Sequence, residues 1–211
     1  MIHAVLLGDS VFDNAAYVAG GPDVVRQLRQ CLPAGAQATL RAVDGSLIRG
    51  VERQMQQLPA DATHLIVSTG GNDALHQVGI IEERVGTVAA ALDRLADIRD
   101  AFERDYRLML DRLLEPGLPA AVCTVYEGRF PDPAYQRRIG TALAVLNDGI
   151  IRQAFARGLP LLDLRLICNR AEDYANPIEP SVQGGAKIAT AIAHFVARHD
   201  PSRRRSEIFV A

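Results

Sequence analysis

Short apolar runs alternate along the chain with longer stretches in which hydrophobic residues recur every three or four positions. The apolar runs have the length of strands and are bounded by Gly, Pro or polar residues, which indicates buried strands. The predicted strands lie at residues 2–7, 38–43, 64–69, 119–125 and 160–164.

The stretches between these runs predict helices. The first begins with Pro22 at its first position, where the fixed backbone of proline favours a helix start. The others are predicted after Ser46, from about Val85 to Leu114, from Ala134 to Ala156 and from Gly185 to Ala197. Strands that alternate with helices are typical of an α/β fold, in which helices cover both faces of a parallel sheet. We expect a single domain over residues 1–200 and a tail over 201–211, which could pack on the body or on a neighbour.

Charge and cysteine content exclude several classes of function. The net charge is −2, so we expect neither a nucleic-acid partner nor a membrane surface, and the cluster Arg203-Arg204-Arg205 is interpreted as a solvated tail. The three cysteines are far apart, which favours free thiols over a zinc site or disulfides. No apolar run approaches about 18 residues, so no membrane span is predicted. A strand at residue 2 leaves no room for a signal peptide, and we expect a cytoplasmic protein.

Polar residues gather where the predicted strands end. In open parallel sheets, ligands bind beyond the carboxyl ends of the strands. Four segments are expected to meet there: Gly8-Asp9-Ser10, Asp44-Gly45-Ser46, Gly70-Gly71-Asn72-Asp73 and the segment from Asn176 to Ser181.

These segments contain the groups that acyl transfer requires. Ser10 could attack a carbonyl, and Asp9 is expected to hold the turn beside it. The N–H groups of Ser10 and Gly45 and the side-chain amide of Asn72 could donate to the oxyanion that forms. One such donor stabilises a transition state by about 3–4 kcal/mol. The alternative for Ser10 is a turn serine that satisfies local backbone groups.

In these blocks the chain resembles the GDSL, or SGNH, family of serine esterases and lipases. That family is marked by a G-D-S block, a later glycine, a G-x-N-D block and a final D-x-x-H-P-S-x-x-G block, and the first three are present here in that order. The resemblance implies a flavodoxin-like three-layer α/β/α sandwich with a five-stranded parallel sheet. It also implies hydrolysis of small acyl esters or thioesters, with no cofactor and no metal.

The final block departs from the family pattern at both catalytic positions. Its Pro180-Ser181-x-x-Gly184 ending aligns Glu179 with the family's histidine and Asn176 with its aspartate. A neutral Asn176 avoids a like-charge pair and could donate a hydrogen bond to Glu179. A free glutamate has a pKa of about 4.3, low for a base at neutral pH, but burial would raise it. We therefore predict a Ser–Glu pair that turns over unactivated esters poorly.

Three other charged residues are candidates for a substrate contact or a charge partner. His76 is expected near the carboxyl ends of the strands, whereas the other four histidines are expected at the opposite end. Arg49 could pair with Glu179 or bind a carboxylate or phosphate, and Asp73 follows Asn72 directly. The alternatives are a partly exposed histidine on a short helix and a solvent-facing arginine.

The leading hypothesis is an esterase of this family with Ser10 as nucleophile and Glu179 in the position of the base. A non-catalytic domain that keeps the ligand pocket, and an acyltransferase that uses the same serine, remain alternatives. A nucleotide or phosphate binder ranks lower because no glycine-rich phosphate loop is present. The sequence leaves the natural ester substrate and the oligomeric state undetermined.

Overall fold

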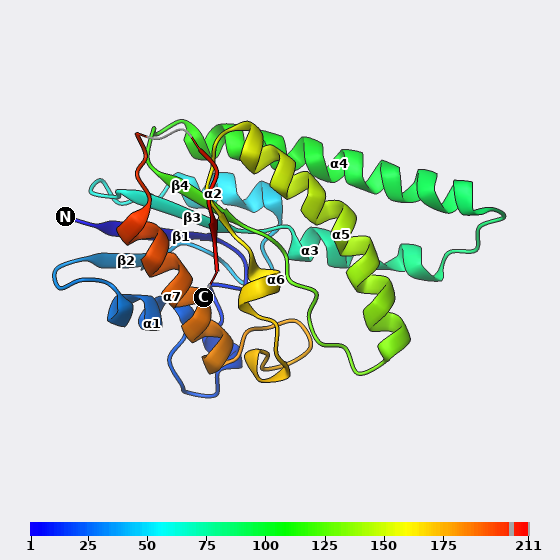
Figure 1. Ribbon diagram of the computed structural model, residues 1–211, viewed down its shortest axis with the longest axis horizontal. Helices are drawn as coiled ribbons and strands as arrows, with labels where there is room; N and C mark the ends of the chain where they lie inside the picture. Colours follow the sequence, from blue (N-terminus) through cyan, green and yellow to red (C-terminus); the bar gives the residue numbers. More distant parts are fainter. Residues whose placement is uncertain (203–204, 211) are drawn as a thin grey trace.

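The computed structural model describes residues 1–202 and 205–210 (Figure 1). Arg203 and Arg204 of the basic cluster lie outside the described residues. None of the helices in the described ranges is both long enough and apolar enough to cross a bilayer.

A parallel sheet forms the centre of the molecule. Its strands, in the spatial order β2-β1-β3-β4-β5-β6, pair in parallel throughout. The strands are β1 (His3–Gly8), β2 (Gln37–Leu40), β3 (His64–Ser68), β4 (Ala120–Cys123), β5 (Leu161–Leu162) and β6 (Ile208–Phe209). The first five correspond to the predicted strands, with β2, β4 and β5 shorter than expected.

The prediction of five strands was wrong by one, because the segment predicted to be a tail contributes β6. Leu161 N–H donates to the carbonyl of Glu207 at 2.7 Å, and Asp163 N–H donates to that of Phe209 at 3.3 Å. An edge strand presents unpaired backbone groups, and the returning chain satisfies those of β5.

Alternate residues of β1 belong to two separate hydrophobic cores. Ala4 and Leu6 pack with α1 (Val24–Cys31) and α7 (Val182–Arg198), whereas Val5 and Leu7 pack on the other face. The helices on that second face are α2 (Val51–Met55), α4 (Val88–Leu114) and α5 (Pro133–Ala156). Because successive side chains of a strand point to opposite faces, a strand buried on both sides is an unbroken apolar run. The predicted three-layer α/β/α arrangement is thus confirmed.

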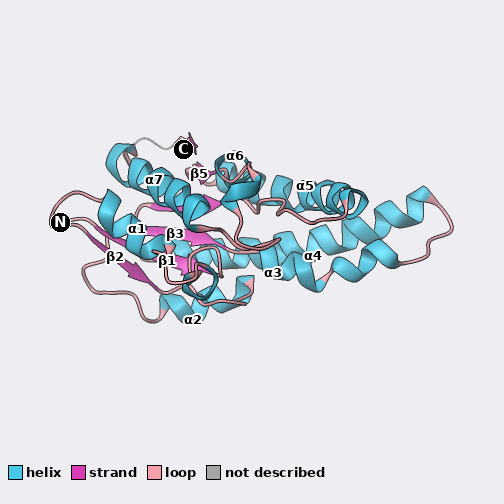
Figure 2. Ribbon diagram, turned by 90° about the horizontal axis from the view of Figure 1, so that it is seen from below, coloured by secondary structure: helices cyan, strands magenta, loops and turns pink. Residues whose placement is uncertain are grey.

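Two helices extend beyond the sheet. The 27 residues of α4 span about 40 Å, whereas the six residues of β1 span about 20 Å. Both views show α4 and α5 running out past the strands (Figures 1 and 2). Two short helices lie beside them, α3 (Gly71–His76) and the 3-10 helix η3 (Val78–Glu82).

The remaining elements are short and lie in the connections. They are α6 (Leu164–Ile167) and the 3-10 helices η1 (Ala15–Tyr17), η2 (Ile48–Gly50) and η4 (Ala171–Asp173).

Candidate active site

The turn that carries Ser10 is fixed by its contacts with β3 and α2. Gly8 ends β1 with φ +121°, and a Cβ there would stand 1.7 Å from the carbonyl oxygen of Ser68. Only glycine therefore permits the close approach of these two strand ends. Gln54 binds both backbone groups of Gly8, accepting from its N–H at 2.7 Å and donating to its carbonyl at 2.8 Å. Ser10 follows, 8% exposed.

The loop that carries Glu179 is held by side chains from two other segments and by Asn176 of its own turn. Tyr126 Oη donates to the carbonyl of Ile178 at 2.7 Å, and Asn14 Nδ2 donates to that of Pro180 at 3.2 Å. Asn176 Oδ1 accepts the N–H groups of Ile178 and Glu179, both at 2.9 Å.

The hydrogen bond that we expected from Asn176 to the Glu179 carboxylate is not formed. The asparagine side chain folds back on the main chain of its own turn, a local arrangement that asparagine favours. Asn176 therefore holds the backbone that presents Glu179, and it does not contact the Glu179 carboxylate.

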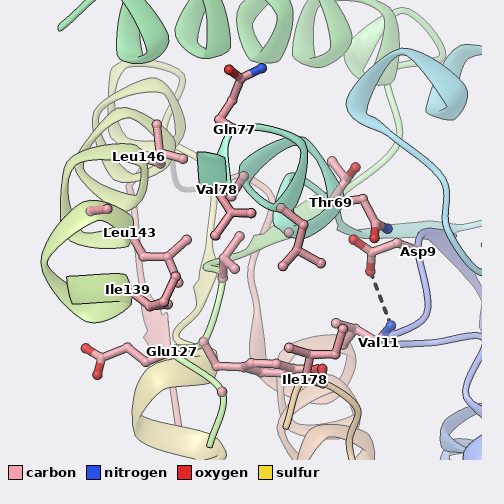
Figure 3. A pocket seen from close by; sticks show the side chains of 18 of the residues that line it. Asp9, Val11, Thr69, Gln77, Val78, Glu127, Ile139, Leu143, Leu146 and Ile178 are labelled. Carbon is pink, nitrogen blue, oxygen red and sulfur yellow. Dashed lines mark hydrogen bonds between the residues drawn. The ribbon is translucent and has the colours of Figure 1, made fainter. Parts of the chain in front are cut away.

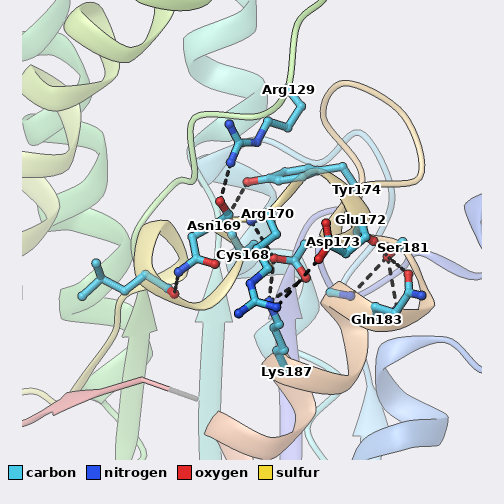
Figure 4. Close-up of polar contacts among 12 residues, drawn as sticks. Arg129, Cys168, Asn169, Arg170, Glu172, Asp173, Tyr174, Ser181, Gln183 and Lys187 are labelled. Carbon is cyan, nitrogen blue, oxygen red and sulfur yellow. Dashed lines mark hydrogen bonds and ion pairs between the residues drawn. The ribbon is translucent and has the colours of Figure 1, made fainter.

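The final block continues into α7, and polar contacts join the start of this helix to the preceding loop (Figure 4). Ser181 caps the helix by accepting the N–H groups of Gln183 and Gly184. A Cβ at Gly184 would lie 2.1 Å from the carbonyl oxygen of Asp173, so the P-S-x-x-G pattern is explained by packing. The Asp173 carboxylate is fully buried and pairs with Lys187 Nζ at 2.8 Å.

Ser10 and Glu179 meet directly, although 169 positions separate them in the chain. Ser10 Oγ donates to Glu179 Oε1 at 3.0 Å. Among the described residues, Oε2 of Glu179 is buried and has no hydrogen-bond partner. Burial raises the pKa of Glu179 to about 7, and the nearby Asp44 carboxylate adds to this, while the bond from Ser10 opposes it. A carboxylate that titrates near neutrality is suited to accept a proton at that pH.

Asp9 is a second buried carboxyl group beside the nucleophile. Its Oδ1 accepts the N–H of Val11 at 3.2 Å, so it holds the turn as expected (Figure 3). Burial raises the pKa of Asp9 to about 8, and the charges of Glu179 and Asp73 add to the rise, although the Val11 N–H lowers it. At neutral pH this carboxyl is therefore mostly protonated and uncharged.

The two other candidate oxyanion donors lie on adjoining segments. Gly45 is exposed and has φ +75° in the turn closed by the bond from Ser46 N–H to the Val43 carbonyl. Asn72, near the start of α3, donates from Nδ2 to the carbonyl of Ser46 at 3.1 Å. Because an amide nitrogen carries two hydrogens, that bond leaves one for a ligand.

Asp73 binds the main chain of the segment that follows Gly45. Its Oδ2 accepts the N–H of Ile48 at 3.0 Å and so joins α3 to η2. Burial raises the pKa of Asp73, while the Ile48 N–H lowers it. Asp73 is therefore placed to hold the segment that follows Gly45.

Arg49 and His76 lie away from the Ser10–Glu179 pair. Arg49 makes a two-pronged ion pair with Asp105 on α4, at 2.9 and 3.2 Å, and its side chain is 77% exposed. His76 is exposed at the end of α3 and lines a different hollow, together with Arg94 and Asp97. Of the alternatives considered for Arg49, the solvent-facing arginine fits best, since its ion pair is with Asp105 and not with Glu179.

Substitution of either residue is expected to leave catalysis unchanged. Arg49→Ala and His76→Ala should each keep kcat/KM for a simple ester within about twofold, because neither side chain lines the pocket beside Ser10 and Glu179 and the exposed ion pair of Arg49 contributes little. Steady-state kinetics of the two variants beside the wild type test this. A loss of tenfold or more in either one would place that side chain in the reaction.

An apolar pocket opens beside Ser10 and Glu179 and runs between the helices that extend past the sheet (Figure 3). Its polar end also includes Asp9, Thr69 and Asn72. Most of its remaining wall is apolar and comes from four helical segments, α3, η3, α4 and α5, and from the loop at residues 125–130, which adds Tyr126 and Phe130.

Comparison with known proteins gives the family. The model of the GDSL-like lipase/acylhydrolase family matches residues 6–187. The chain belongs to this family. The match runs from β1, which leads to Ser10, to the first turns of α7, and so includes every segment of the site. No curated protein sequence matches significantly.

Solved structures of a lipase and of esterases share the fold at low identity. An extracellular lipase from Streptomyces rimosus superposes with a TM-score of 0.63 at 15% identity, over 88% of this chain and 95% of the lipase. An aryl esterase from M. smegmatis superposes with a TM-score of 0.66 at 12% identity, over 93% of this chain and 99% of the esterase. An acetyl xylan esterase superposes with a TM-score of 0.61 at 18% identity, over 89% of this chain and 96% of the esterase.

Sequence reasoning missed one residue that shapes the site. Gln54 lies on α2 between Val51 and Met55, and its side chain is buried. A glutamine on a buried face must find partners for its amide, so its position was a usable signal. Its partner, the backbone of Gly8, followed only from the tertiary structure.

Proposed function

We propose that this GDSL-family hydrolase is a carboxylic ester hydrolase in which Ser10 is the nucleophile and Glu179 is the general base. The observation that carries the proposal is the 3.0 Å bond from Ser10 Oγ to a carboxylate whose pKa is about 7. General bases work best when their pKa lies near the working pH. A buried glutamate can therefore take the part of the histidine that the family usually carries there.

The reaction would proceed in two halves. Ser10 Oγ attacks the ester carbonyl while its proton passes to Glu179 Oε1, which gives a tetrahedral oxyanion. Glu179 then donates that proton to the leaving alcohol oxygen as the carbon–oxygen bond breaks, and the acyl group remains on Ser10. In the second half, Glu179 takes a proton from water, the resulting hydroxide displaces Ser10, and the proton returns to Oγ.

Three N–H groups are proposed as donors to the oxyanion: the backbone groups of Ser10 and Gly45 and the second amide hydrogen of Asn72. The bond from Asn72 to the Ser46 carbonyl supports this assignment, since it fixes the amide before substrate binds. Donors that are oriented in advance cost no reorganisation during the reaction. Asn176 and Asp9 are proposed as positioning residues, through the N–H groups of Ile178 and Glu179 and of Val11 respectively.

Covalent labelling of Ser10 tests the proposal. We expect a fluorophosphonate to give one adduct per chain, located on Ser10 by peptide mass spectrometry, because only an activated serine displaces fluoride. Ser10→Ala should give no adduct, and Ser202→Ala, at an exposed serine, should label like the wild type. A folded wild-type protein that does not label would favour a binding domain over an enzyme.

A further inference from the structure

We propose that the apolar pocket beside Ser10 binds the acyl chain of the substrate, so that this protein acts on esters of unbranched aliphatic acids of about six to eight carbons. The inference rests on the proposed function, since it assigns the group that Ser10 carries between the two halves of the reaction.

The length of the pocket follows from its wall on α5. Ile139, Leu143 and Leu146 line it at positions i, i+4 and i+7, which places them along one face of the helix. Seven residues of helix rise by about 10 Å. An extended acyl chain advances about 1.2 Å per bond, so the length of this wall equals that of about eight bonds of the chain.

The opposite wall is equally apolar. Ile80 and Ile81 of η3 and Leu95 and Ile98 of α4 line the pocket across from α5. These segments belong to the part of the molecule that extends beyond the sheet (Figures 1 and 2). Aliphatic side chains on both walls favour a flexible hydrocarbon over a sugar, whose hydroxyl groups would lose their hydrogen bonds to water.

The charges around the pocket exclude an anionic occupant. No Lys, Arg or His among the described residues lines it. Its acidic lining residues are Asp9, Glu127 and Glu179, and Asp9 is mostly uncharged at neutral pH. A carboxylate or phosphate on the substrate would find no cation there, whereas a neutral hydrocarbon needs none.

The acyl group suits this enclosed space better than the alcohol does. The acyl group stays on Ser10 through both halves of the reaction, whereas the alcohol must take a proton from Glu179 and leave so that water can enter. The exposed Asp44 is near enough to influence Glu179 but does not line the pocket, and its carboxylate accepts a 2.6 Å bond from Tyr17 Oη. The alcohol therefore departs past polar, solvated groups.

Chain-length profiles test the inference. With p-nitrophenyl esters of two to twelve carbons, we expect kcat/KM to rise about threefold per methylene up to about eight carbons and then level off or fall. Ala142→Phe, which fills the pocket from α5, should shift the optimum to four carbons or fewer. Ala144→Phe, at an exposed position of the same helix, is the matched control and should keep the wild-type profile.

A second series separates acyl from alcohol recognition. Acetate esters of alcohols from ethanol to octanol should show a shallow profile that Ala142→Phe leaves unchanged. A preference for acetyl esters in the wild type, or an effect of Ala142→Phe on the alcohol series alone, would overturn the assignment. Ala142→Leu, a smaller change, provides the same comparison if the phenylalanine variant unfolds in a thermal melt.

Binding measured without turnover separates failure of this inference from failure of the proposed function. Octanamide, a neutral analogue of the acyl group, should bind the wild type at least tenfold more tightly than it binds Ala142→Phe in calorimetry. If Ser10 is inert and octanamide still binds in this way, the pocket assignment stands and the esterase proposal falls. If Ser10 labels and octanamide shows no such difference, the pocket assignment is wrong.

Discussion

Replacement of Ser10 with alanine is expected to abolish ester hydrolysis, with a loss in kcat of at least about 10⁴-fold, and Glu179→Gln is expected to lower kcat by about 10²- to 10⁴-fold. Glutamine keeps the size of the side chain and can still accept the bond from Ser10 Oγ, but it cannot take the proton. Stopped-time assays with p-nitrophenyl butyrate, with active-site concentration fixed by phosphonate titration of the wild type, measure both losses.

The pH profile distinguishes loss of the base from loss of structure. For the wild type, kcat/KM should rise through about pH 7 as Glu179 loses its proton, and it should fall above about pH 8 as Asp9 becomes charged beside the developing oxyanion. The two carboxyl groups influence each other, so the two midpoints describe the pair. Full activity in Glu179→Gln would show that the base lies elsewhere.

Restoration of the family's usual pair is the complementary control. The double variant Asn176→Asp, Glu179→His should hydrolyse the same ester at least as fast as the wild type. An aspartate at position 176 can still accept the N–H groups of residues 178 and 179, so the turn is preserved. The single variant Glu179→His, without the aspartate, should hydrolyse the ester more slowly than the double variant, since no carboxylate orients its ring.

Asp9→Asn is expected to raise the free energy of unfolding at pH 8 by a few kcal/mol and to change it little near pH 4. In the folded protein the pKa of Asp9 is raised to about 8 from 3.8, so between these values the folded state holds a proton that the unfolded chain has lost. Stability from this group is therefore complete at low pH and is lost as pH rises through about 8. One pKa unit corresponds to about 1.4 kcal/mol, and the raised pKa of Glu179 adds to the same trend.

Urea unfolding near pH 4 and at pH 8 measures this effect. The wild type should be markedly less stable at pH 8, and Asp9→Asn should reduce the difference. An asparagine can keep the bond from Val11 N–H, so the turn survives the change. Asp93→Asn, at an exposed position of α4, is the control and should leave the difference unchanged. If Asp9→Asn and Asp93→Asn showed the same difference in stability between pH 4 and pH 8, the Asp9 carboxyl would be charged in the folded protein across this range.

The sequence by itself determined the layers of the fold and the order of the chemical blocks. Strands buried on both faces must be apolar at every position, so β1 and β3 were visible as unbroken runs. The glycines at 8 and 184 were visible as parts of motifs, since each stands where a side chain would collide with backbone. The alignment of Glu179 with the family's histidine stays a prediction from the sequence, based on the Pro-Ser-x-x-Gly ending.

Tertiary structure alone decided how these parts act together. Whether a glutamate can serve as a base depends on its burial, and burial is set by segments distant in the chain, among them the loop of Tyr126 and that of Asn14. The sequence does not say which acidic residue pairs with Arg49. The packing of α4 against η2 places Asp105 beside it. The strand β6 was too short to show a pattern and formed because β5 left an open edge. The pocket forms because α4 and α5 extend beyond the ends of the strands. There, the apolar faces of these helices face each other instead of the sheet.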